Sequence, residues 1–396
     1  MKKKYRIILY TSIFLLCVVA SIILVVKKSN SVYEEESKPK VVKHKSMLSM
    51  NLEQTAGSGD YKTVTQSKWP TEGYKFNAEL SRCENGSTLS WDDTKKAVIV
   101  SGNLSDKCYV YFDIYQPTLA EYIKSQYTGT QGDNGIYYHN STLANGAGDN
   151  SYRYAGASDS VNNYVCLGSD EATCPDANLF RIIGVFGDQT KVIRAKSVGN
   201  KQWHTSESNT WSTSSLNTYL NGEYLTSLGT IAEKIATTTW KVGGGSWSNI
   251  SASVPKTAYQ NEVGSSASTT TVNKKIGLMY VSDYYYSASP SAWTLMGYNS
   301  DATKDYRAAK TTNWLYLGSY EWTVSRYSDR TTHAFSVTST GDVLHSNVTD
   351  SYAVRPSFNL ESSVYVSGSG SMSDPVRVTD WRTVLNNPRW NIGEMR

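Results

Sequence analysis

Four acidic residues lie in close pairs in this sequence, Asp92 with Asp93 and Asp301 with Asp305. Two carboxylates can hydrolyse a glycosidic bond when they flank it at a defined separation. Proximity in the sequence does not establish that separation. We therefore expect these acids to be solvated loop residues, and we predict no catalytic residue among them.

Histidines are the other side chains that could do acid–base or metal chemistry. The five are scattered over the chain, at His44, His139, His204, His333 and His345. His333 and His345 flank a predicted turn and could face each other across a hairpin. A zinc site needs three or four protein ligands, and no third ligand lies near this pair. Cross-strand packing is the favoured interpretation, so we predict no metal site and no cofactor.

The sequence signatures of common enzymes are absent. The chain contains no HExxH, no GxSxG and no kinase or Walker series. Gly243, Gly244 and Gly245 form a glycine run, but the Lys-Ser/Thr pair of a phosphate-binding loop does not follow them. The sequence therefore predicts a protein that is not an enzyme of a recognisable class.

Aromatic side chains are the feature that most suggests a binding surface. They make up 12% of the chain, and Tyr alone numbers 29. In exposed loops, Tyr and Trp would offer rigid contact area to a protein or a glycan. The rings in segments predicted as loops are Tyr284, Tyr285, Tyr286, Trp293, Tyr298, Trp314, Tyr316 and Tyr320. For any single ring, burial in a core short of Leu and Phe is the commoner outcome.

The N-terminus predicts a membrane anchor. Residues 7–26 are apolar and uncharged, and at about 1.5 Å per residue they would span roughly 30 Å of hydrocarbon. A signal peptide and, through Cys17, a lipoprotein signal are the alternatives. The run is longer than a signal-peptide core and does not end in small residues. We expect a single-pass transmembrane helix at 7–26, with residues 1–6 in the cytoplasm.

Cysteine usage points to the extracellular side for the rest of the chain. Beyond the anchor lie two pairs that are close in sequence, Cys83 with Cys108 and Cys166 with Cys174. An even count fits two disulfides in an oxidising compartment. Reduced thiols or a metal site are the alternatives, and the spacings match no zinc pattern.

The charge distribution argues against nucleic acid as a partner. The formal net charge is +4, but residues 1–45 contain ten Lys/Arg and three acids, which leaves 29 basic and 32 acidic residues beyond them. A mildly acidic extracellular part is a poor binder of polyanions. The predicted partners are the membrane, through the N-terminal helix, and an unidentified surface protein or glycan.

Composition divides the chain beyond the anchor into five segments. We predict a polar stalk at residues 27–75, a small β unit stapled by Cys83–Cys108 at 76–115, a helix and loop connector at 116–151, a main α+β domain at 152–378 and a C-terminal tail at 379–396. The stalk is predicted to bury no core because it is charged and poor in apolar residues.

Alternating and helical patterns place the elements of the main domain. Strands are predicted at residues 179–186, 191–196 and 276–282, and helices from Trp211 onward and over 231–240. Three further strands are predicted in succession, at residues 333–337, 343–348 and 352–360, with a turn at Gly341. Pro356 indicates an edge position or a bulge, and Arg355 is expected to make a buried hydrogen-bonded pair.

An ordered series of motifs resembles a known family. NYVCLG, LFRIIGVF, WSTSSLNTYLNGEYL, KIGLMYVSDYYY, EWTVSRYS, AVRPSFNL and SGSGSMSDPVRV together resemble a domain of unknown function in cell-surface proteins of low-GC Gram-positive gut bacteria. The last third is distantly similar to the C-type-lectin-like fold of formylglycine-generating-type proteins. This likeness implies an α+β, C-type-lectin-like main domain in which Trp322, Gly341, Val354 and Arg355 are structural.

The resemblance carries over no active site. The late paired cysteines of formylglycine-generating oxidases are missing, because no cysteine follows Cys174, and the calcium-binding triplets of sugar-binding lectins are also missing. The sequence therefore predicts a membrane-anchored extracellular binding or adhesion protein. A cell-wall or glycan-directed hydrolase, with carboxylates drawn from separate loops, is the alternative, and a purely structural envelope protein is a third possibility.

Overall fold

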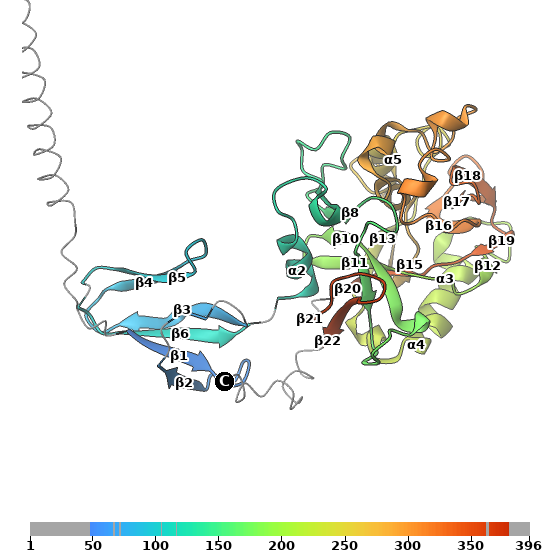
Figure 1. Cartoon of the computed structure of the whole chain (residues 1–396). Coiled ribbons are helices and arrows are strands. Elements are labelled where there is room, and N and C mark those ends of the chain that lie inside the picture. Colours follow the sequence, from blue (N-terminus) through green and yellow to red (C-terminus); the bar gives the residue numbers. More distant parts are fainter. Residues whose placement is uncertain are drawn as a thin grey trace, which may run out of the picture. The chain divides into compact units, whose positions relative to one another are not determined.

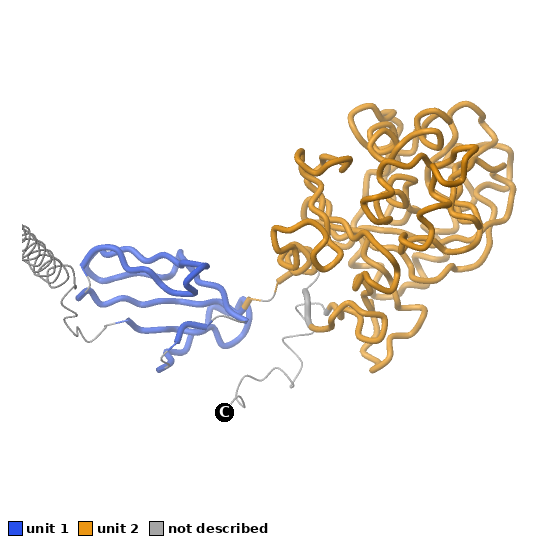
Figure 2. Tube along the Cα trace, turned by 45° about the horizontal axis from the view of Figure 1, so that its top comes forward, with its two compact units in different colours: residues 1–114 blue, residues 115–396 orange. Residues whose placement is uncertain are grey.

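The computed structural model (Figure 1) describes residues 48–379 except 66–67, 71–72, 104, 116 and 362–363. The chain divides into two compact units, Met1–Ile114 and Tyr115–Arg396 (Figure 2). The predicted transmembrane helix at 7–26 and nearly all of the predicted tail lie outside the described residues. Within the described part, no helix is both long and apolar enough to cross a bilayer.

The first unit is a small β structure. Its four-stranded sheet has the order β2-β1-β6-β3, in which β1 runs parallel to β6 and the other pairs are antiparallel. These strands are β1 (Leu48–Glu53), β2 (Tyr61–Val64), β3 (Tyr74–Cys83) and β6 (Cys108–Ile114), and a separate hairpin joins β4 (Thr88–Asp92) to β5 (Ala97–Ser101). Met50, Val110 and Phe112 form its small core.

The predicted stalk is wrong for residues 48–64, which supply two strands of this sheet. Leu48, Met50 and Leu52 alternate with polar residues; Met50 belongs to the core of the unit, and Leu48 and Leu52 pack against it. The side chain of Glu53 is buried at the strand end, where it accepts hydrogen bonds from the backbone N–H groups of Gly59 and Ile114. The alternation of apolar and polar residues over 48–52 therefore marks a strand. It is hard to recognise because the run is short and lies within a polar segment.

Both predicted disulfides are formed. Cys83 and Cys108 are register partners on β3 and β6, and Cys166 is bonded to Cys174 in the second unit. The first bond closes a separation of 25 residues. In the chain-entropy account such a link stabilises the folded unit by about 3.5 kcal/mol.

We expect the Cys83→Ala/Cys108→Ala double variant to lower the opening free energy of β6 amides by about 3.5 kcal/mol, because the unfolded unit gains loop freedom. Native-state hydrogen exchange of the whole chain measures this change. Cys166→Ala/Cys174→Ala is the matched control and should leave β6 unaffected. Unchanged β6 protection in the first variant would show that the small core alone holds the unit.

The second unit is built on a large, mainly antiparallel sheet. Its strand order is β15-β20-β11-β10-β9-β22-β21, with β8 also paired to β10 and β7 to β8. The strands are β7 (Ile136–Tyr138), β8 (Tyr152–Tyr154), β9 (Tyr164–Cys166), β10 (Leu179–Phe186), β11 (Gln189–Arg194), β15 (Ile276–Gly277), β20 (Ser357–Leu360), β21 (Val364–Ser367) and β22 (Val376–Thr379). The pair β22–β9 is parallel.

A second sheet and a separate antiparallel pair of strands contain the other strands of this unit. The five-stranded sheet has the order β12-β19-β16-β17-β18, and β13 pairs with β14. Their bounds are β12 (Asn200–Gln202), β13 (Thr238–Lys241), β14 (Thr271–Lys274), β16 (Glu321–Arg326), β17 (His333–Val337), β18 (Val343–Asn347) and β19 (Ser351–Ala353).

The predicted hairpin at 333–348 is confirmed, but the predicted third strand is not one strand. The chain leaves the small sheet after β19 and enters the large sheet at β20. Between them, Arg355 turns its side chain inward to Glu321, and Pro356 has no N–H for a ladder. This crossing joins the two sheets through one short segment.

Helices are short and connect the strands. They are α2 (Leu119–Ser125), α3 (Ser215–Tyr219), α4 (Leu225–Ser227), α5 (Pro255–Glu262) and α6 (Val281–Tyr286), with a π-helical turn η4 (Leu220–Tyr224). Single 3-10 turns are η1 (Asp133–Gly135), η2 (Asp176–Asn178), η3 (Trp211–Thr213), η5 (Gly229–Lys234), η6 (Pro290–Thr294), η7 (Ala302–Lys304) and η8 (Lys310–Thr312). The helical segment predicted from Trp211 is confirmed, with Ser214 as its N-cap.

The predicted connector belongs to the second unit. Thr118 and Glu121 form a capping box at the start of α2, and Leu119 and Ile123 are buried in the main core. Helix α2 packs against β10 and β11. The folded domain therefore begins near Tyr115 rather than at residue 152.

Two element types were predicted wrongly. Trp240 lies in β13 rather than in a helix, and the strand predicted at 276–282 ends at Gly277. The chain then starts α6, where Asp283 accepts a hydrogen bond from the backbone N–H of Tyr280 (2.8 Å). An acidic residue in the first turn caps a helix when it accepts such a bond. This cap favours a helix here over the strand that the apolar residues before it suggest.

Candidate functional site

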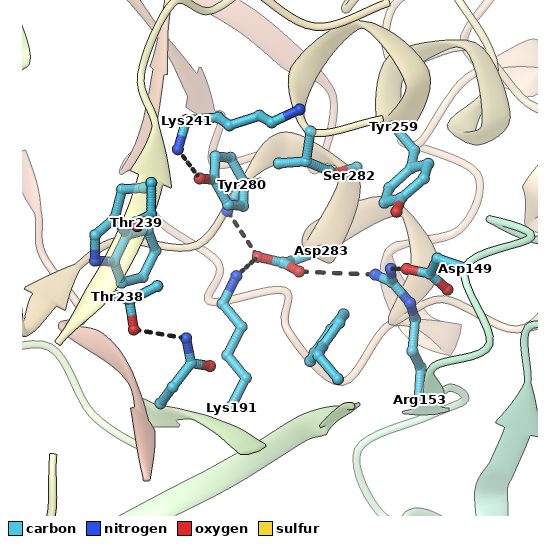
Figure 3. Close-up of a pocket in the computed structure, with 14 residues that line it drawn as sticks. Asp149, Arg153, Lys191, Thr238, Thr239, Lys241, Tyr259, Tyr280, Ser282 and Asp283 are labelled. Atoms are coloured by element: carbon cyan, nitrogen blue, oxygen red, sulfur yellow. Dashed lines mark hydrogen bonds and ion pairs between the residues drawn. The ribbon is translucent and has the colours of Figure 1, made fainter. Parts of the chain in front are cut away.

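A pocket of about 240 Å³ opens in the second unit beside β8, β11, β13, α5 and the start of α6 (Figure 3). Its volume is just below the range of typical small-molecule sites, about 300–1,000 Å³. Charged side chains and aromatic rings share its lining. The charged members are Asp149, Arg153, Lys191, Lys241 and Asp283, and the aromatic members are Phe186, Trp240, Tyr259 and Tyr280.

The floor of the pocket is a row of register partners on four neighbouring strands. Arg153 on β8 lies opposite Gly184 on β10, Gly184 opposite Lys191 on β11, and Lys191 opposite Asn359 on β20. A Cβ at Gly184 would lie 2.3 Å from the carbonyl oxygen of Tyr152. The missing side chain lets β8 pair closely with β10 and so brings Arg153 into this row.

Asp283 joins the two cations from the helix above them. Its Oδ2 accepts a hydrogen bond from Lys191 Nζ at 2.5 Å, and its Oδ1 lies 3.8 Å from a guanidinium nitrogen of Arg153. The side chains of Lys191, Arg153 and Asp283 are at most 7% exposed. Burial lowers the pKa of Lys191, while Asp283 favours its charged form. Charges this deeply buried persist only when they are paired.

Asp149 extends the chain of alternating charges. Arg153 donates to Asp149 Oδ2 (2.6 Å), and the backbone N–H and hydroxyl of Ser151 donate to Oδ1. Burial on its own raises the pKa of Asp149, but Arg153 and Ser151 outweigh it and hold this pKa far below the usual range. Asp149 is therefore an ionised acceptor, not a proton donor.

Aromatic rings surround both cations. The Arg153 guanidinium lies 4.7 Å from the ring centre of Phe186 and 5.4 Å from that of Tyr259. Lys191 Nζ lies 4.6 Å from the ring centre of Tyr280 and 5.4 Å from that of Trp240. These cation–π contacts stabilise the charges and keep the local dielectric low.

A third acidic group lies behind the lining. Glu262, at the end of α5, accepts hydrogen bonds from the backbone N–H groups of Val281 and Ser282 and from the Ser325 hydroxyl. Burial raises the pKa of Glu262, and these donors only partly oppose the rise. The carboxyl group holds the start of α6 in place and does not line the pocket.

The predicted aromatic surface is not formed. Tyr284, Tyr285 and Tyr286 lie on α6 and are at most 1% exposed, and Trp293 and Trp314 are also buried. Their polar atoms bind inside the protein: for example, the Tyr284 and Tyr285 hydroxyls donate to the carbonyls of Gly341 and Ile250. These five rings fill a core poor in Leu and Phe.

The remaining predicted loop aromatics are only partly accessible. Tyr298 and Tyr316 are half-buried, and Tyr320 is 39% exposed. Tyr298 packs against Trp247, and the Tyr316 hydroxyl donates to the carbonyl of Ser339. They do not gather at the pocket, and none of the three lines it.

The predicted acid pairs are not arranged as catalytic pairs. Asp92 accepts from the backbone N–H groups of a turn, and Asp301 caps η7. Asp305 is buried and pairs with Arg307 (2.6 Å), which corrects the expectation that it is solvated. Each carboxylate therefore has a local structural partner.

The two histidines expected to meet across the hairpin do so. The ring centres of His333 and His345 are 5.1 Å apart, and His345 stacks on Tyr327 at 4.2 Å. No group of three His, Cys, Asp or Glu side chains suited to a metal ion occurs among the residues described. The contact is a cross-strand ring pair.

The residues assigned structural roles by resemblance are all buried. Trp322 and Val354 are fully buried, and Gly341 has a φ of 101° in its turn. Arg355 Nε and Nη2 donate to the two carboxylate oxygens of Glu321, at 2.7 and 2.8 Å. Such a two-pronged pair joins the β16 strand to the segment that crosses between sheets.

Sequence reasoning missed the charged residues of the pocket. Lys191 and Arg153 each stand alone within short runs of strand-forming residues, TKVI and YRYA, and Asp283 follows the apolar run GLMYVS. A single charge inside a buried strand is the signal that could have marked them. The contact between Lys191 and Asp283 could not be predicted from the sequence, because the two residues are 92 positions apart.

Residues 187–362 match a family described as a domain of unknown function (DUF6273). This supports the predicted likeness to a family of unknown function over less than half of the chain. No curated protein and no solved structure matches the chain. Lys191 and Asp283 lie within the matched segment, whereas Asp149 and Arg153 precede it. The pocket thus needs residues from outside the matched segment.

Proposed function

We propose that the chain is a membrane-anchored extracellular binding protein that takes a small group of its ligand into the pocket of the second unit. The observation that carries the proposal is the buried series Lys191, Asp283, Arg153 and Asp149 at the base of an open, aromatic-lined pocket. Converging polar groups with shifted pKa values in a cleft are typical of binding or active sites.

Binding is favoured over hydrolysis by the state of the two carboxylates. Asp149 and Asp283 both line the pocket, which is the observation that favours a glycan hydrolase. A glycosidase needs one carboxyl group that carries a proton near neutral pH. Asp149 has a pKa far below its usual range, and Asp283 is paired with Lys191. Neither carboxyl group is suited to be that acid.

The cellular setting of the proposal rests on the sequence and the disulfides. The apolar run at 7–26 is of membrane-spanning length, and two disulfides fit an oxidising compartment. We further propose a C-type-lectin-like fold for the main unit, on the basis of its late hairpin and the buried Trp322 and Arg355. The partner class remains a surface protein or a glycan.

Filling the pocket tests the function. Thr239 lines the pocket from β13 and is exposed, so Thr239→Trp adds a bulky ring at the rim of the pocket without replacing a core residue. We expect Thr239→Trp to weaken binding of the full chain, in nanodiscs, to a cell-envelope or host-surface fraction by about tenfold, since contacts in such a pocket dominate affinity.

Thr239→Val is the matched control, because both variants lose the hydrogen bond from Thr239 to Asn273 (2.8 Å). It should bind like the unsubstituted chain. Equal binding by Thr239→Trp would exclude the pocket as the binding site. Release of soluble glycan fragments that is abolished in Asp149→Asn would instead establish the hydrolase.

A further inference from the structure

We propose that the ligand group entering this pocket carries a carboxylate, and that Lys191, Arg153 and Lys241 recognise it. This inference rests on the proposed function and names the chemistry of its ligand. The pocket lining contains three cations and two carboxylates, which leaves one positive charge. A ligand anion of single charge balances it.

The cations retain hydrogen-bonding capacity that the protein does not use. A lysine ammonium has three donors, and among the described residues Lys191 Nζ donates to Asp283 alone. Arg153 directs Nε and Nη2 to Ser151 and Asp149, whereas its Nη1 lies 3.8 Å from Asp283, beyond hydrogen-bond distance. Both cations therefore have N–H groups available to an incoming acceptor.

The carboxylates of the pocket offer much less to a cationic ligand. Both oxygens of Asp149 and the Oδ2 of Asp283 accept hydrogen bonds from the protein. The Oδ1 of Asp283 faces Arg153. An ammonium group entering the pocket would meet Lys191 and Arg153 before it met a free acceptor. The surplus of donors over acceptors selects an anion.

The walls favour a carboxylate attached to a ring or another compact body. Trp240 and Tyr280 have ring centres 5.9 Å apart beside Lys191, and Tyr259 lies on the other side near Arg153. Rings this close keep water away, and an ion pair in a low dielectric is stronger than one in solvent. Lys241 adds a third cation to the lining: its backbone N–H donates to the Tyr280 hydroxyl (2.9 Å), and its ammonium group donates to the carbonyl of Gly264 (3.1 Å).

The test compares Thr239→Glu with Thr239→Gln in the full chain. The two side chains have the same length and differ only by a negative charge at the mouth of the pocket. We expect Thr239→Glu to bind the envelope or host-surface fraction about tenfold more weakly than Thr239→Gln, because the added carboxylate repels an anionic ligand in a partly desolvated site. The difference should shrink in 1 M salt.

Defined probes separate the two possible sources of such a carboxylate. N-acetylmuramic acid represents bacterial wall, N-acetylneuraminic acid represents host glycans, and the methyl ester of each is its uncharged control. Calorimetric titration should show one of the acids binding at least about tenfold more tightly than its ester. Lys241→Gln should reduce that preference, whereas Lys256→Gln, on the exposed side of α5 outside the pocket, should not.

The outcomes distinguish this inference from the proposed function. If Thr239→Glu and Thr239→Gln bind equally while Thr239→Trp does not bind, the pocket is the binding site but carboxylate recognition is overturned. Equal affinity of the chain for each acid and its methyl ester would likewise overturn carboxylate recognition. If Thr239→Trp also binds normally, the proposed function fails and this inference fails with it.

Discussion

Replacing Arg355 by Met should destabilise the second unit by about 3–5 kcal/mol, since removal of one partner leaves a buried charge uncompensated. Glu321 is 1% exposed, and both of its carboxylate oxygens accept from Arg355. The same guanidinium donates to the carbonyl of Leu315. The variant therefore loses a charge pair and removes the donor to three buried acceptor oxygens. Urea unfolding of the second unit measures the loss.

The pH dependence identifies the cause of that loss. Burial raises the pKa of Glu321, and Arg355 opposes this rise. In Arg355→Met the opposition is gone, so the folded state binds a proton more readily than the unfolded state. A carboxyl pKa that is higher in the folded state makes stability fall as pH rises. We expect the variant to recover part of its stability between pH 7 and pH 5.

A double variant provides the control. Glu321→Leu combined with Arg355→Met replaces the pair by apolar side chains, an exchange that is often neutral or stabilising. It should unfold within about 1 kcal/mol of the unsubstituted protein and lack the acid-linked recovery. A single variant as stable as the parent at pH 7 would contradict a structural role for this pair.

Elements with a strong local pattern were predictable. The hairpin of β17 and β18 follows from alternation and the turn at Gly341, and the strands β10 and β11 and the helical segment from Trp211 follow from their apolar patterns. The predicted disulfides Cys83–Cys108 and Cys166–Cys174, each between cysteines close in sequence, are also confirmed. In these cases the local preference and the tertiary fold agree.

Elements set by tertiary contacts were not predictable. The run GLMYVSDYYY has the composition of a strand followed by a loop, yet Asp283 and the buried rings make α6 of it. The rings are buried because β16 and β17 pack against the helix, and the carbonyls of Gly341, Ile250 and Asn145 accept hydrogen bonds from the three tyrosine hydroxyls. The sequence within ten residues of α6 contains none of these partners, so it could not indicate that the rings are buried.

The pocket has the same non-local origin. Its four register partners come from β8, β10, β11 and β20, and the glycine among them matters only because β8 approaches there. The tyrosine-rich composition suggested recognition through exposed loop rings, but the rings that enclose the charges are others: Phe186, Trp240, Tyr259 and Tyr280. Composition does not reveal which rings shield the ionic row from solvent.

Asp283→Asn should destabilise the second unit by about 3–5 kcal/mol, because it leaves Lys191 and Arg153 close together without the intervening anion. The asparagine oxygen can still accept from the backbone N–H of Tyr280, so the cap of α6 is retained. The loss therefore reports the charge and not the helix start. Chemical unfolding at pH 7 measures it.

The pH dependence of this variant has the opposite sign to that of Arg355→Met. Burial already lowers the pKa of Lys191, and Asp283 is the group that most opposes the lowering. Without it the folded state binds the lysine proton less readily than the unfolded state, so stability rises with pH. We expect Asp283→Asn to gain stability between pH 7 and pH 9.5. Adding Lys191→Met to Asp283→Asn should restore most of the lost stability and remove its dependence on pH. If the stability of Asp283→Asn alone does not change with pH, Lys191 is not the buried cation held by this carboxylate.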